Sequence, residues 1–379
     1  MTLETLNTLY KLHKSKVLFG RYITNSHIKK CLGKLRSCNF KVLGYSVKNQ
    51  PIYNLIYGNG PIKILLWSQM HGNESTTTKA LFDCINVFEA REEPVNLILK
   101  SCTLNIIPIL NPDGAQSYTR YNANGVDLNR DAQQLSQPES KILRQLFDEI
   151  SPNFCFNLHG QRTIFGAGNT GNSAILSFLA PSQDQLKTLT LNRKMAMAII
   201  VGVHTLLQKE IPNKVGRYDD EFNLNCVGDT FQNLGVPTLL YEAGHYPKDY
   251  NREESRRLIF LSILKALGLI SNGLDTLEYK QYFNIPQNEK CFYDIIIRNA
   301  KIDTYNRDIG IQYYENLVNN TIEFIPKIER ITKLNNYFGH KELNAGNQIV
   351  KIPNTTELKI KNKIDFVSIK NEKITLKIK

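Results

Sequence analysis

The stretch IKILLWSQMHGNE, residues 62–74, decides the fold class of this chain. Its first part, IKILLWS, is a nearly continuous apolar run, which is typical of a strand that is buried on both faces of a sheet. A stretch with apolar residues at helical spacing follows at 75–90, so the strand leads directly into a helix. A buried strand followed by a helix indicates an α/β sheet that is covered on both sides.

The same alternation continues along the chain. Apolar runs predict strands at 102–110, 153–158 and 236–241, and helical spacing predicts helices at 138–150, 184–208 and 252–268. Upstream, the Gly58–Pro61 turn and the apolar alternation before it predict a hairpin. We therefore predict an α/β fold with a mixed, largely parallel central sheet that is covered by helices on both faces.

Composition divides the chain into three regions. Residues 1–39 are basic and have helical spacing, and the alternating strands and helices occupy residues 40–272. Beyond them, β-branched runs such as YDIIIRNAKID and EKITLKIK are separated by Asn, Gly and Pro. We predict a basic helical N-terminal extension at 1–39, a central domain at 40–272 and a small C-terminal β-rich module at 273–379.

The overall composition is that of an ordinary globular protein. Of the 379 residues, 42% are hydrophobic and 22% are charged. The seven cysteines stand at wide spacings and form no CxxC pair. A disulfide framework and a zinc–cysteine site are therefore not expected.

Positive charge is concentrated at the beginning of the chain. The formal net charge is +12, and residues 1–50 hold ten Lys and Arg against one acidic residue. A basic segment can meet phosphates or anionic lipid, but it is more often a solvated helix face. No RNP, KH or zinc-finger pattern accompanies it, so nucleic acid is not an expected partner. The sequence carries no signal for an oligomeric state.

The sequence predicts neither a membrane span nor export. No stretch reaches the roughly 18 consecutive apolar residues that a membrane helix needs. The beginning, MTLETLNTLYKLHKSK, lacks the apolar run and the small-residue cleavage site of a signal peptide. We therefore expect a cytoplasmic protein.

Polar residues follow several of the predicted buried strands. His71 and Glu74 come after the strand at 62–68, and His159 comes after the strand at 153–158. Histidine and carboxylate are ligands that Zn²⁺ prefers, and a catalytic zinc site keeps one position open. Glu242 follows the strand at 236–241, where an unpaired buried carboxylate would be costly. A metal-bound water nearby would explain that carboxylate.

A loop with two arginines follows the turn NPDG at 111–114. It reads TRYNANGVDLNR and spans residues 119–130. Because a guanidinium group pairs bidentately with a carboxylate, this loop indicates a site for an anionic group.

Together, these elements resemble the carboxypeptidase A-like zinc carboxypeptidases. The motifs HGNE, NPDG and TRxNxxGVDLNR, the strand-terminal His159 and the strand-terminal Glu242 occur in that family's order. The match covers roughly residues 40–270. The resemblance implies a zinc metallopeptidase, with residues 40–272 as its catalytic domain.

The resemblance implies a zinc site with a general base beside it. His71, Glu74 and His159 would hold one Zn²⁺ ion. Asp127 would accept a hydrogen bond from the other ring nitrogen of His71 and fix its tautomer. Glu242 would take a proton from the attacking water and give it to the leaving amine.

The resemblance also implies how the substrate is held. Arg120 would stabilise the oxyanion, and Asn129 and Arg130 would bind the terminal carboxylate of the substrate. A mobile tyrosine of the family closes over the substrate. Tyr218 lies at about the right distance before Glu242, and Tyr246 is its rival.

Side-chain preference in this family is set in the stretch before the general base, here around residues 226–230. Asp229 lies in that stretch and would favour a cationic side chain in the substrate. Three nearby acids, Asp219, Asp220 and Glu221, could do the same from a loop. All four could instead be loop caps or solvated acids.

The resemblance leaves related activities open. The leading interpretation is a carboxypeptidase that hydrolyses the C-terminal amide bond of short peptides with a free carboxylate. The separation of His71 and His159 is short, as in the aspartoacylase and succinylglutamate desuccinylase group, so a zinc-dependent deacylase of N-acyl amino acids is an alternative. The NPDG and TRxNANGVDLNR forms look more like the peptidase branch, which includes murein-peptide amidases. A catalytically idle binding protein is a further alternative.

Overall fold

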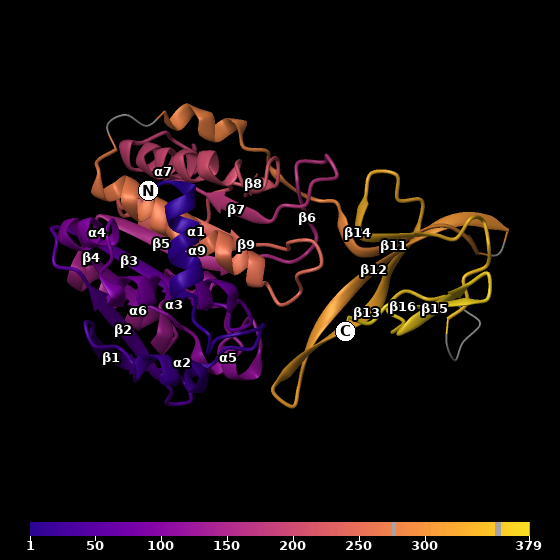
Figure 1. Cartoon of the computed structure of the whole chain (residues 1–379), viewed down its shortest axis with the longest axis horizontal. Coiled ribbons are helices and arrows are strands. Elements are labelled where there is room, and N and C mark those ends of the chain that lie inside the picture. Colours follow the sequence, from indigo (N-terminus) through magenta and orange to yellow (C-terminus); the bar gives the residue numbers. More distant parts are fainter. Residues whose placement is uncertain (275–277, 303, 353–357, 379) are drawn as a thin grey trace. The chain divides into compact units, whose positions relative to one another are not determined.

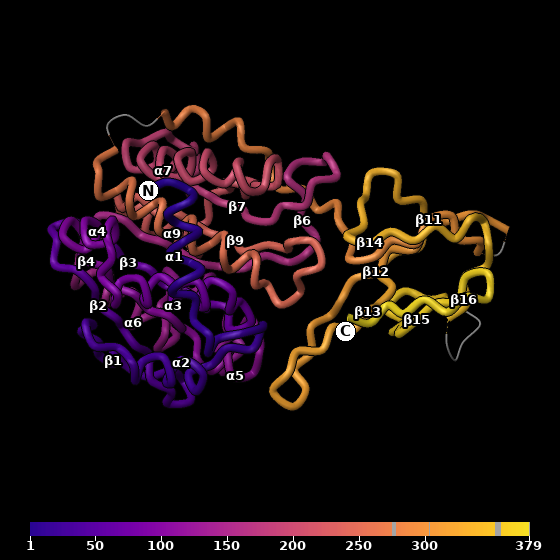
Figure 2. The backbone as a smooth tube through the Cα atoms, viewed as in Figure 1, coloured from indigo at the N-terminus to yellow at the C-terminus, as the bar shows by residue number. Residues whose placement is uncertain are grey.

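The computed structural model describes residues 1–274, 278–302, 304–352 and 358–378 (Figure 1, Figure 2). Its contacts divide the chain into two compact units. Unit 1 comprises Met1–Gln161 and Ala174–Asn288, and unit 2 comprises Arg162–Ser173 and Glu289–Lys379. The chain therefore leaves unit 1 for a short segment before it returns to complete the central sheet.

Unit 1 is built on an eight-stranded mixed sheet in the order β1-β2-β4-β3-β5-β9-β7-β8. The bounds are β1 Asn39–Tyr45, β2 Pro51–Tyr57, β3 Ile62–Ser68, β4 Cys102–Ile107, β5 Phe154–Gly160, β7 Leu176–Leu179, β8 Val215–Arg217 and β9 Thr238–Ala243. The central strands β4, β3, β5 and β9 are parallel to one another. Strands β2 and β7 flank them antiparallel, so the predicted mixed, largely parallel sheet is confirmed.

Helices cover both faces of this sheet (Figure 1). The larger hydrophobic cluster contains residues of α1 Leu3–His13, α2 Asn25–Leu32, α3 Thr76–Ala90, α4 Val95–Ser101, α7 Leu191–Leu207 and α9 Glu253–Ser271. The smaller cluster contains residues of α6 Pro138–Ile150 and α8 Val227–Asn233. Over the described ranges, every helix falls short of the length or the hydropathy that a bilayer crossing requires.

The side chains of β3 explain why the run IKILLWS is apolar throughout. Ile64 and Leu66 lie in the larger cluster, and Leu65 and Trp67 lie in the smaller one. Successive residues of a strand point to opposite faces, so a strand covered on both sides must be apolar at every position.

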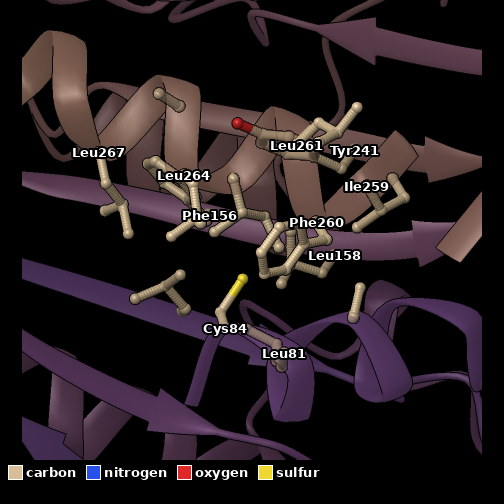
Figure 3. Packing of buried hydrophobic residues seen from close by; sticks show 14 of the residues in the cluster. Leu81, Cys84, Phe156, Leu158, Tyr241, Ile259, Phe260, Leu261, Leu264 and Leu267 are labelled. Carbon is tan, nitrogen blue, oxygen red and sulfur yellow. The ribbon is translucent and has the colours of Figure 1, made fainter. Parts of the chain in front are cut away.

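The larger cluster fills the space between the sheet and two long helices. Figure 3 shows Phe156 of β5 and Tyr241 of β9 among side chains such as Leu264 of α9 and Cys84 of α3. Tyr241 points into this cluster, so its neighbour Glu242 points to the opposite face of the sheet. The same alternation places His159 on that opposite face, because Leu158 lies in the larger cluster.

The N-terminal helices are part of unit 1, held there by a buried ion pair. Arg256 on α9 and Asp83 on α3 are both fully buried, with 2.6 Å between Nη2 and Oδ1. The Arg256 guanidinium also donates to the backbone carbonyls of Ser15 and Leu18, at 2.9 and 2.7 Å. The Ser15 amide in turn donates to Asp83 at 2.7 Å. The basic N-terminal segment is thus fastened to two core helices.

Unit 2 is β-rich, as predicted for the C-terminal part of the chain. A four-stranded sheet has the order β13-β12-β11-β14, with bounds β11 Phe292–Ile302, β12 Tyr305–Val318, β13 Thr321–Thr332 and β14 Phe338–Asn344. Two strand pairs accompany it, β15 Phe366–Ile369 with β16 Glu372–Thr375, and β6 Phe165–Ala167 with β10 Asn288–Lys290. Ile295, Ile311 and Val367 belong to its separate hydrophobic cluster.

Several boundaries differ from those read from the sequence. Unit 1 ends at Asn288 rather than at residue 272, because the 3₁₀-helix η2, Tyr279–Asn284, places Tyr282 in the larger cluster of unit 1. The N-terminal segment expected to be helical at 1–39 is interrupted between α1 and α2. The helix expected at 184–208 begins only at Leu191. Residues 275–277, 303, 353–357 and 379 of the predicted module lie outside the described residues.

We expect Arg256→Ala to lower the free energy of unfolding by about 3–5 kcal/mol, because it leaves the Asp83 carboxylate buried without its partner. Urea or guanidinium denaturation measures this change. Arg144→Ala is the matched control, since Arg144 pairs with Asp148 at 3.0 Å across a partly exposed helix face. Its cost should be below about 1 kcal/mol. Equal losses in the two variants would contradict the anchoring role of Arg256.

Candidate metal centre

Three side chains from distant parts of the sequence converge at one edge of the central sheet. His71 and Glu74 lie between β3 and α3, and His159 lies in β5. Glu74 Oε1 is 2.9 Å from His71 Nδ1, and Glu74 Oε2 is 2.9 Å from His159 Nδ1. The two Nδ1 atoms are 3.1 Å apart. One ligand atom from each of the three side chains lies within 4.8 Å of the other two.

This donor set fits a zinc ion. Two imidazole nitrogens and one carboxylate, with a position left open, are the ligands of many catalytic zinc sites. His71 presents Nδ1 to the group, because its Nε2 lies 3.1 Å from Asp127 Oδ1. A carboxylate on the outer nitrogen fixes the ring orientation, as is usual for a zinc-bound histidine. Over the described residues, this is the one group of three or more His, Cys, Asp or Glu side chains with ligand atoms so close.

The two glycine-containing motifs are packed against each other. A Cβ atom on Gly72 would lie 1.9 Å from the carbonyl carbon of Gly114, so the HGNE turn approaches the NPDG segment too closely for any side chain at position 72. The NPDG motif opens helix α5, Pro112–Ser117, and Asn111 is its N-cap. The Asn111 side chain accepts from the Gly114 amide at 2.8 Å and donates to the Met70 carbonyl at 3.1 Å. NPDG therefore supports the loop that carries His71.

Glu242 lies beside His159 in the sheet. The two residues are register partners on the parallel strands β5 and β9, and directly paired positions of neighbouring strands point to the same face. Glu242 Oε2 and His159 Nε2 are buried atoms without a hydrogen-bond partner among the described residues. A buried carboxylate oxygen without a partner is unusual and indicates that the site around Glu242 is built to receive something else.

The carboxylates of this site have opposite pKa shifts. Burial raises the pKa of Glu242 well above its usual range, and the negative charge of Glu74 raises it further. Burial also acts to raise the pKa of Glu74, but the charge of His71 and the hydrogen bonds of both imidazoles outweigh it, and that pKa is lowered. Glu74 is therefore ionised, as a metal ligand must be, while Glu242 holds a proton more readily.

Arg120 is tied to the metal group through Asp127. Its Nε donates to Asp127 Oδ2 at 2.9 Å, and its Nη1 lies 3.3 Å from His71 Nδ1 and 3.8 Å from Glu74 Oε1. The Arg120 side chain is still 39% exposed. A cation fixed at the site but open to solvent is suited to meet a negatively charged oxygen of a bound molecule.

Asn129 and Arg130 extend the site toward α8. The Asn129 side chain accepts a hydrogen bond from the Val227 amide at 3.0 Å. Arg130 is exposed, and its Nη1 lies 2.7 Å from the Asn129 carbonyl and 3.2 Å from Cys226 Sγ. The loop with two arginines thus reaches from the metal group to the beginning of α8.

The two candidate tyrosines lie in different surroundings. Burial raises the pKa of Tyr218, and the charges of Glu242 and Glu74 raise it further, so its phenol is within electrostatic reach of the metal group. Tyr246 packs instead against the larger hydrophobic cluster. Of the two, Tyr218 is the one whose pKa is affected by the charges of the metal group.

The acids near α8 also separate into distinct groups. Asp229 lies in the first turn of α8 and is 7% exposed. Burial raises the pKa of Asp229 to about 6, and the charge of Arg130 opposes that shift. Asp220 forms ion pairs with Arg193 and with Lys187, so its charge is already compensated.

Sequence reasoning missed three residues that support the site. Gln69 is buried and donates to the carbonyl of Gly72 at 2.8 Å. The backbone amide of Gln161 donates to the Ala243 carbonyl at 3.0 Å, and the Arg252 guanidinium donates to the same carbonyl at 2.8 Å. Nothing in the sequence around Gln69 or Arg252 indicates that these residues support the site. Only the position of Gln161, two residues after His159, could have drawn attention.

A family model described as zinc carboxypeptidase matches residues 35–260. Carboxypeptidase SOL1 of Arabidopsis thaliana is 28% identical over 163 residues, which are 37% of this chain and 33% of the relative. Probable carboxypeptidase 2 of Arthroderma benhamiae is 28% identical over 110 residues, which are 28% of this chain and 20% of the relative. The matched segments thus span at most about a third of the length of these two relatives.

Two solved structures share the fold. A metallo-carboxypeptidase from Burkholderia cenocepacia matches with a TM-score of 0.53 and 18% identity, over 66% of this chain and 69% of the other. Carboxypeptidase A from Helicoverpa armigera matches with a TM-score of 0.55 and 16% identity, over 72% and 81% of the two chains. At these identities the comparison supports the fold of the chain.

We expect the purified chain to bind one zinc ion, and His71→Ala or His159→Ala to lose it, because each removes a ligand from a site that needs at least three. Elemental analysis after dialysis measures the zinc content. Glu242→Gln should keep the metal.

His204→Ala is the matched control for this experiment, because His204 is a half-buried histidine on α7 that lies 2.9 Å from the side chain of Gln208. It should retain full zinc. Asp127→Asn should weaken zinc affinity by about 10–100-fold in competition with a chelator. Full occupancy in His71→Ala would rule that residue out as a ligand.

Proposed function

Since the chain belongs to the zinc carboxypeptidase family and is therefore a metallopeptidase, we propose that it hydrolyses the C-terminal amide bond of short peptides. The observation that carries this proposal is the convergence of His71, Glu74 and His159 beside the strand-terminal Glu242. A carboxylate base next to an open metal position is what the hydrolysis of an unreactive amide requires.

His71, Glu74 and His159 would hold the zinc ion. When bound, zinc supplies positive charge that polarises the scissile carbonyl and lowers the pKa of a water molecule toward 7. Asp127 accepts from His71 Nε2 and so keeps the Nδ1 lone pair available to the metal. The low pKa of Glu74 keeps that carboxylate ionised for the same purpose.

Glu242 would move the proton. As general base it would take the proton from the attacking water, and as general acid it would deliver that proton to the leaving amine. A carboxyl group whose pKa is raised by burial and by Glu74 has greater proton affinity than an exposed glutamate. That affinity suits a group that must first accept a proton and then release it.

Arg120 would stabilise the oxygen that becomes negative in the transition state. Asp127 holds its guanidinium from one side, so the donors are in place before the reaction. Loss of one such donor typically costs about 3–4 kcal/mol of transition-state stabilisation.

Asn129 and Arg130 would bind the terminal carboxylate of the substrate. The Asn129 side chain is oriented by the Val227 amide, and the exposed fork of Arg130 can form a bidentate pair with a carboxylate. Tyr218 would contact the bound substrate. A clamp on the terminal carboxylate restricts cleavage to the end of a chain.

The proposal is tested with a panel of free-acid peptides, the same peptides amidated at the C-terminus, and N-acyl amino acids. We expect zinc-dependent cleavage of the free-acid peptides, little cleavage of the amides, and complete inhibition by a chelator. Glu242→Gln should lose most of kcat while keeping its zinc, because the general base contributes about 10²–10⁴-fold.

Arg130→Ala should raise KM for free-acid peptides and leave the slow cleavage of amidated peptides unchanged. Arg144→Ala, which removes a guanidinium from the outer face of α6, is the control and should leave both unchanged. Faster cleavage of N-acyl amino acids than of peptides would contradict the proposal and support the deacylase alternative. Equal cleavage of free-acid and amidated peptides would refute the carboxylate clamp.

We further propose that Asp229 favours a cationic C-terminal side chain. Its pKa of about 6 means that it is ionised above that pH and neutral below it. The ratio of kcat/KM for peptides ending in Lys to those ending in Leu should therefore fall as the pH drops through about 6. Asp229→Asn should abolish both the preference and its pH dependence, whereas the exposed Asp219→Asn should keep them. A ratio that is constant from pH 5 to 8 would contradict this role.

A further inference from the structure

The last residues of unit 1 run along the strand that leads to Tyr218. The Arg217 amide at the end of β8 donates to the Pro286 carbonyl at 2.8 Å, and Arg217 pairs with Gln287 as a parallel bridge. The Arg217 guanidinium also lies over the ring of Tyr282, 5.4 Å from its centroid. The segment that ends at Asn288 is thus fixed directly beside the residue that precedes Tyr218.

The Asn288 side chain uses its hydrogen-bonding groups toward the candidate site. Its Oδ1 accepts from Ser177 Oγ at 2.9 Å, and its Nδ2 donates to Gln161 Oε1 at 3.0 Å. A further hydrogen bond joins the Asn288 side chain to the Tyr218 phenol. A Cβ atom on Gly216 would lie 1.9 Å from Asn288 Oδ1, so this arrangement requires glycine at position 216.

Two partners of Asn288 lie directly beside the residues that carry the reacting groups. Ser177 on β7 is the register partner of Glu242 on β9. Gln161 follows β5, two residues after His159, and its own side chain donates to the Ala174 carbonyl at 2.7 Å. Both partners are held by the central sheet. The Tyr218 phenol is thus connected through one amide to two fixed points next to the metal ligand and the general base.

From this arrangement we propose that Asn288 is a positioning residue that holds the Tyr218 phenol over the candidate site. The inference rests on the proposed function, in which Tyr218 contacts the substrate. Tyr218 lies just beyond a strand end, where the backbone alone leaves a side chain several rotamers to choose from. A hydrogen bond that selects one of them before the substrate arrives reduces the entropy that binding must overcome.

The kinetic test compares Asn288→Ala and the similarly sized Asn288→Leu with Asn86→Ala. Asn86 is the matched control, since it is a half-buried asparagine on α3 whose amide donates to the His13 carbonyl at 2.8 Å. Both Asn288 variants should raise KM for free-acid peptides by about three- to tenfold, the worth of one hydrogen bond. Their kcat should stay unchanged, and Asn86→Ala should change neither constant.

A double-mutant cycle with Tyr218→Phe separates positioning from general destabilisation. If Asn288 acts through the phenol hydroxyl, Asn288→Ala should add little to the KM of Tyr218→Phe. Full additivity of the two substitutions would overturn the proposal. So would an unchanged or lowered KM in both Asn288 variants, or a failure of both to fold, which would make Asn288 a structural residue of unit 1.

A readout that does not depend on activity keeps this inference apart from the proposed function. In the zinc-loaded chain, hydroxyl-radical footprinting with mass spectrometry reports the exposure of Tyr218. Its oxidation rate should rise in both Asn288 variants and stay unchanged in Asn86→Ala. If the unmodified chain cleaves no peptide, the proposed function fails, and the footprint still decides the role of Asn288. An unchanged footprint in the Asn288 variants overturns the inference.

Discussion

The carboxylate of Glu74 is the contact on which the candidate site depends. Its two oxygens reach one imidazole each, His71 and His159, at 2.9 Å, and Oε2 also accepts from the Gly160 amide at 3.0 Å. One side chain from the loop between β3 and α3 thereby joins that loop to the end of β5. A carboxylate can be buried there because charge and hydrogen bonds compensate its desolvation.

The same carboxylate determines the chemistry of its neighbour. Glu74 and Glu242 are two acids at one sheet edge, and burial with mutual repulsion raises the pKa of Glu242 while the imidazoles lower that of Glu74. Pairs of acids whose surroundings drive their pKa values apart are typical of sites that divide the roles of ligand and proton carrier. A divalent cation is the charge that would allow both to be ionised together.

The fold could be predicted from the sequence because the central strands are recognisable as continuous apolar runs. A strand such as β3 must be apolar at every position, so IKILLWS is visible without the structure. His159 and Glu242 could be placed at one sheet edge because polar residues ending apolar strands are conspicuous. The end of unit 1 at Asn288 could not be predicted, and neither could the role proposed for that residue, since both depend on long-range contacts such as those of Asn288 with Ser177 and Gln161. Such long-range pairing leaves no periodic trace in the sequence.

The candidate site has residues that the sheet holds in place and residues that lie outside the sheet. His159 and Glu242 are held in register by a parallel pair of strands, and the close approach of Gly72 to Gly114 leaves the His71 loop little freedom. Arg130 lies instead in the 3₁₀-helix η1, Leu128–Arg130, and Asp229 lies in the first turn of α8. Contacts of Arg130 with Cys226 and of Asn129 with Val227 join these two segments, which lie outside the strands of the sheet. Under the proposed function, the preference for a substrate side chain could therefore change through substitutions in these segments while the geometry of the metal group stays the same, because residues outside the sheet accept substitutions more readily.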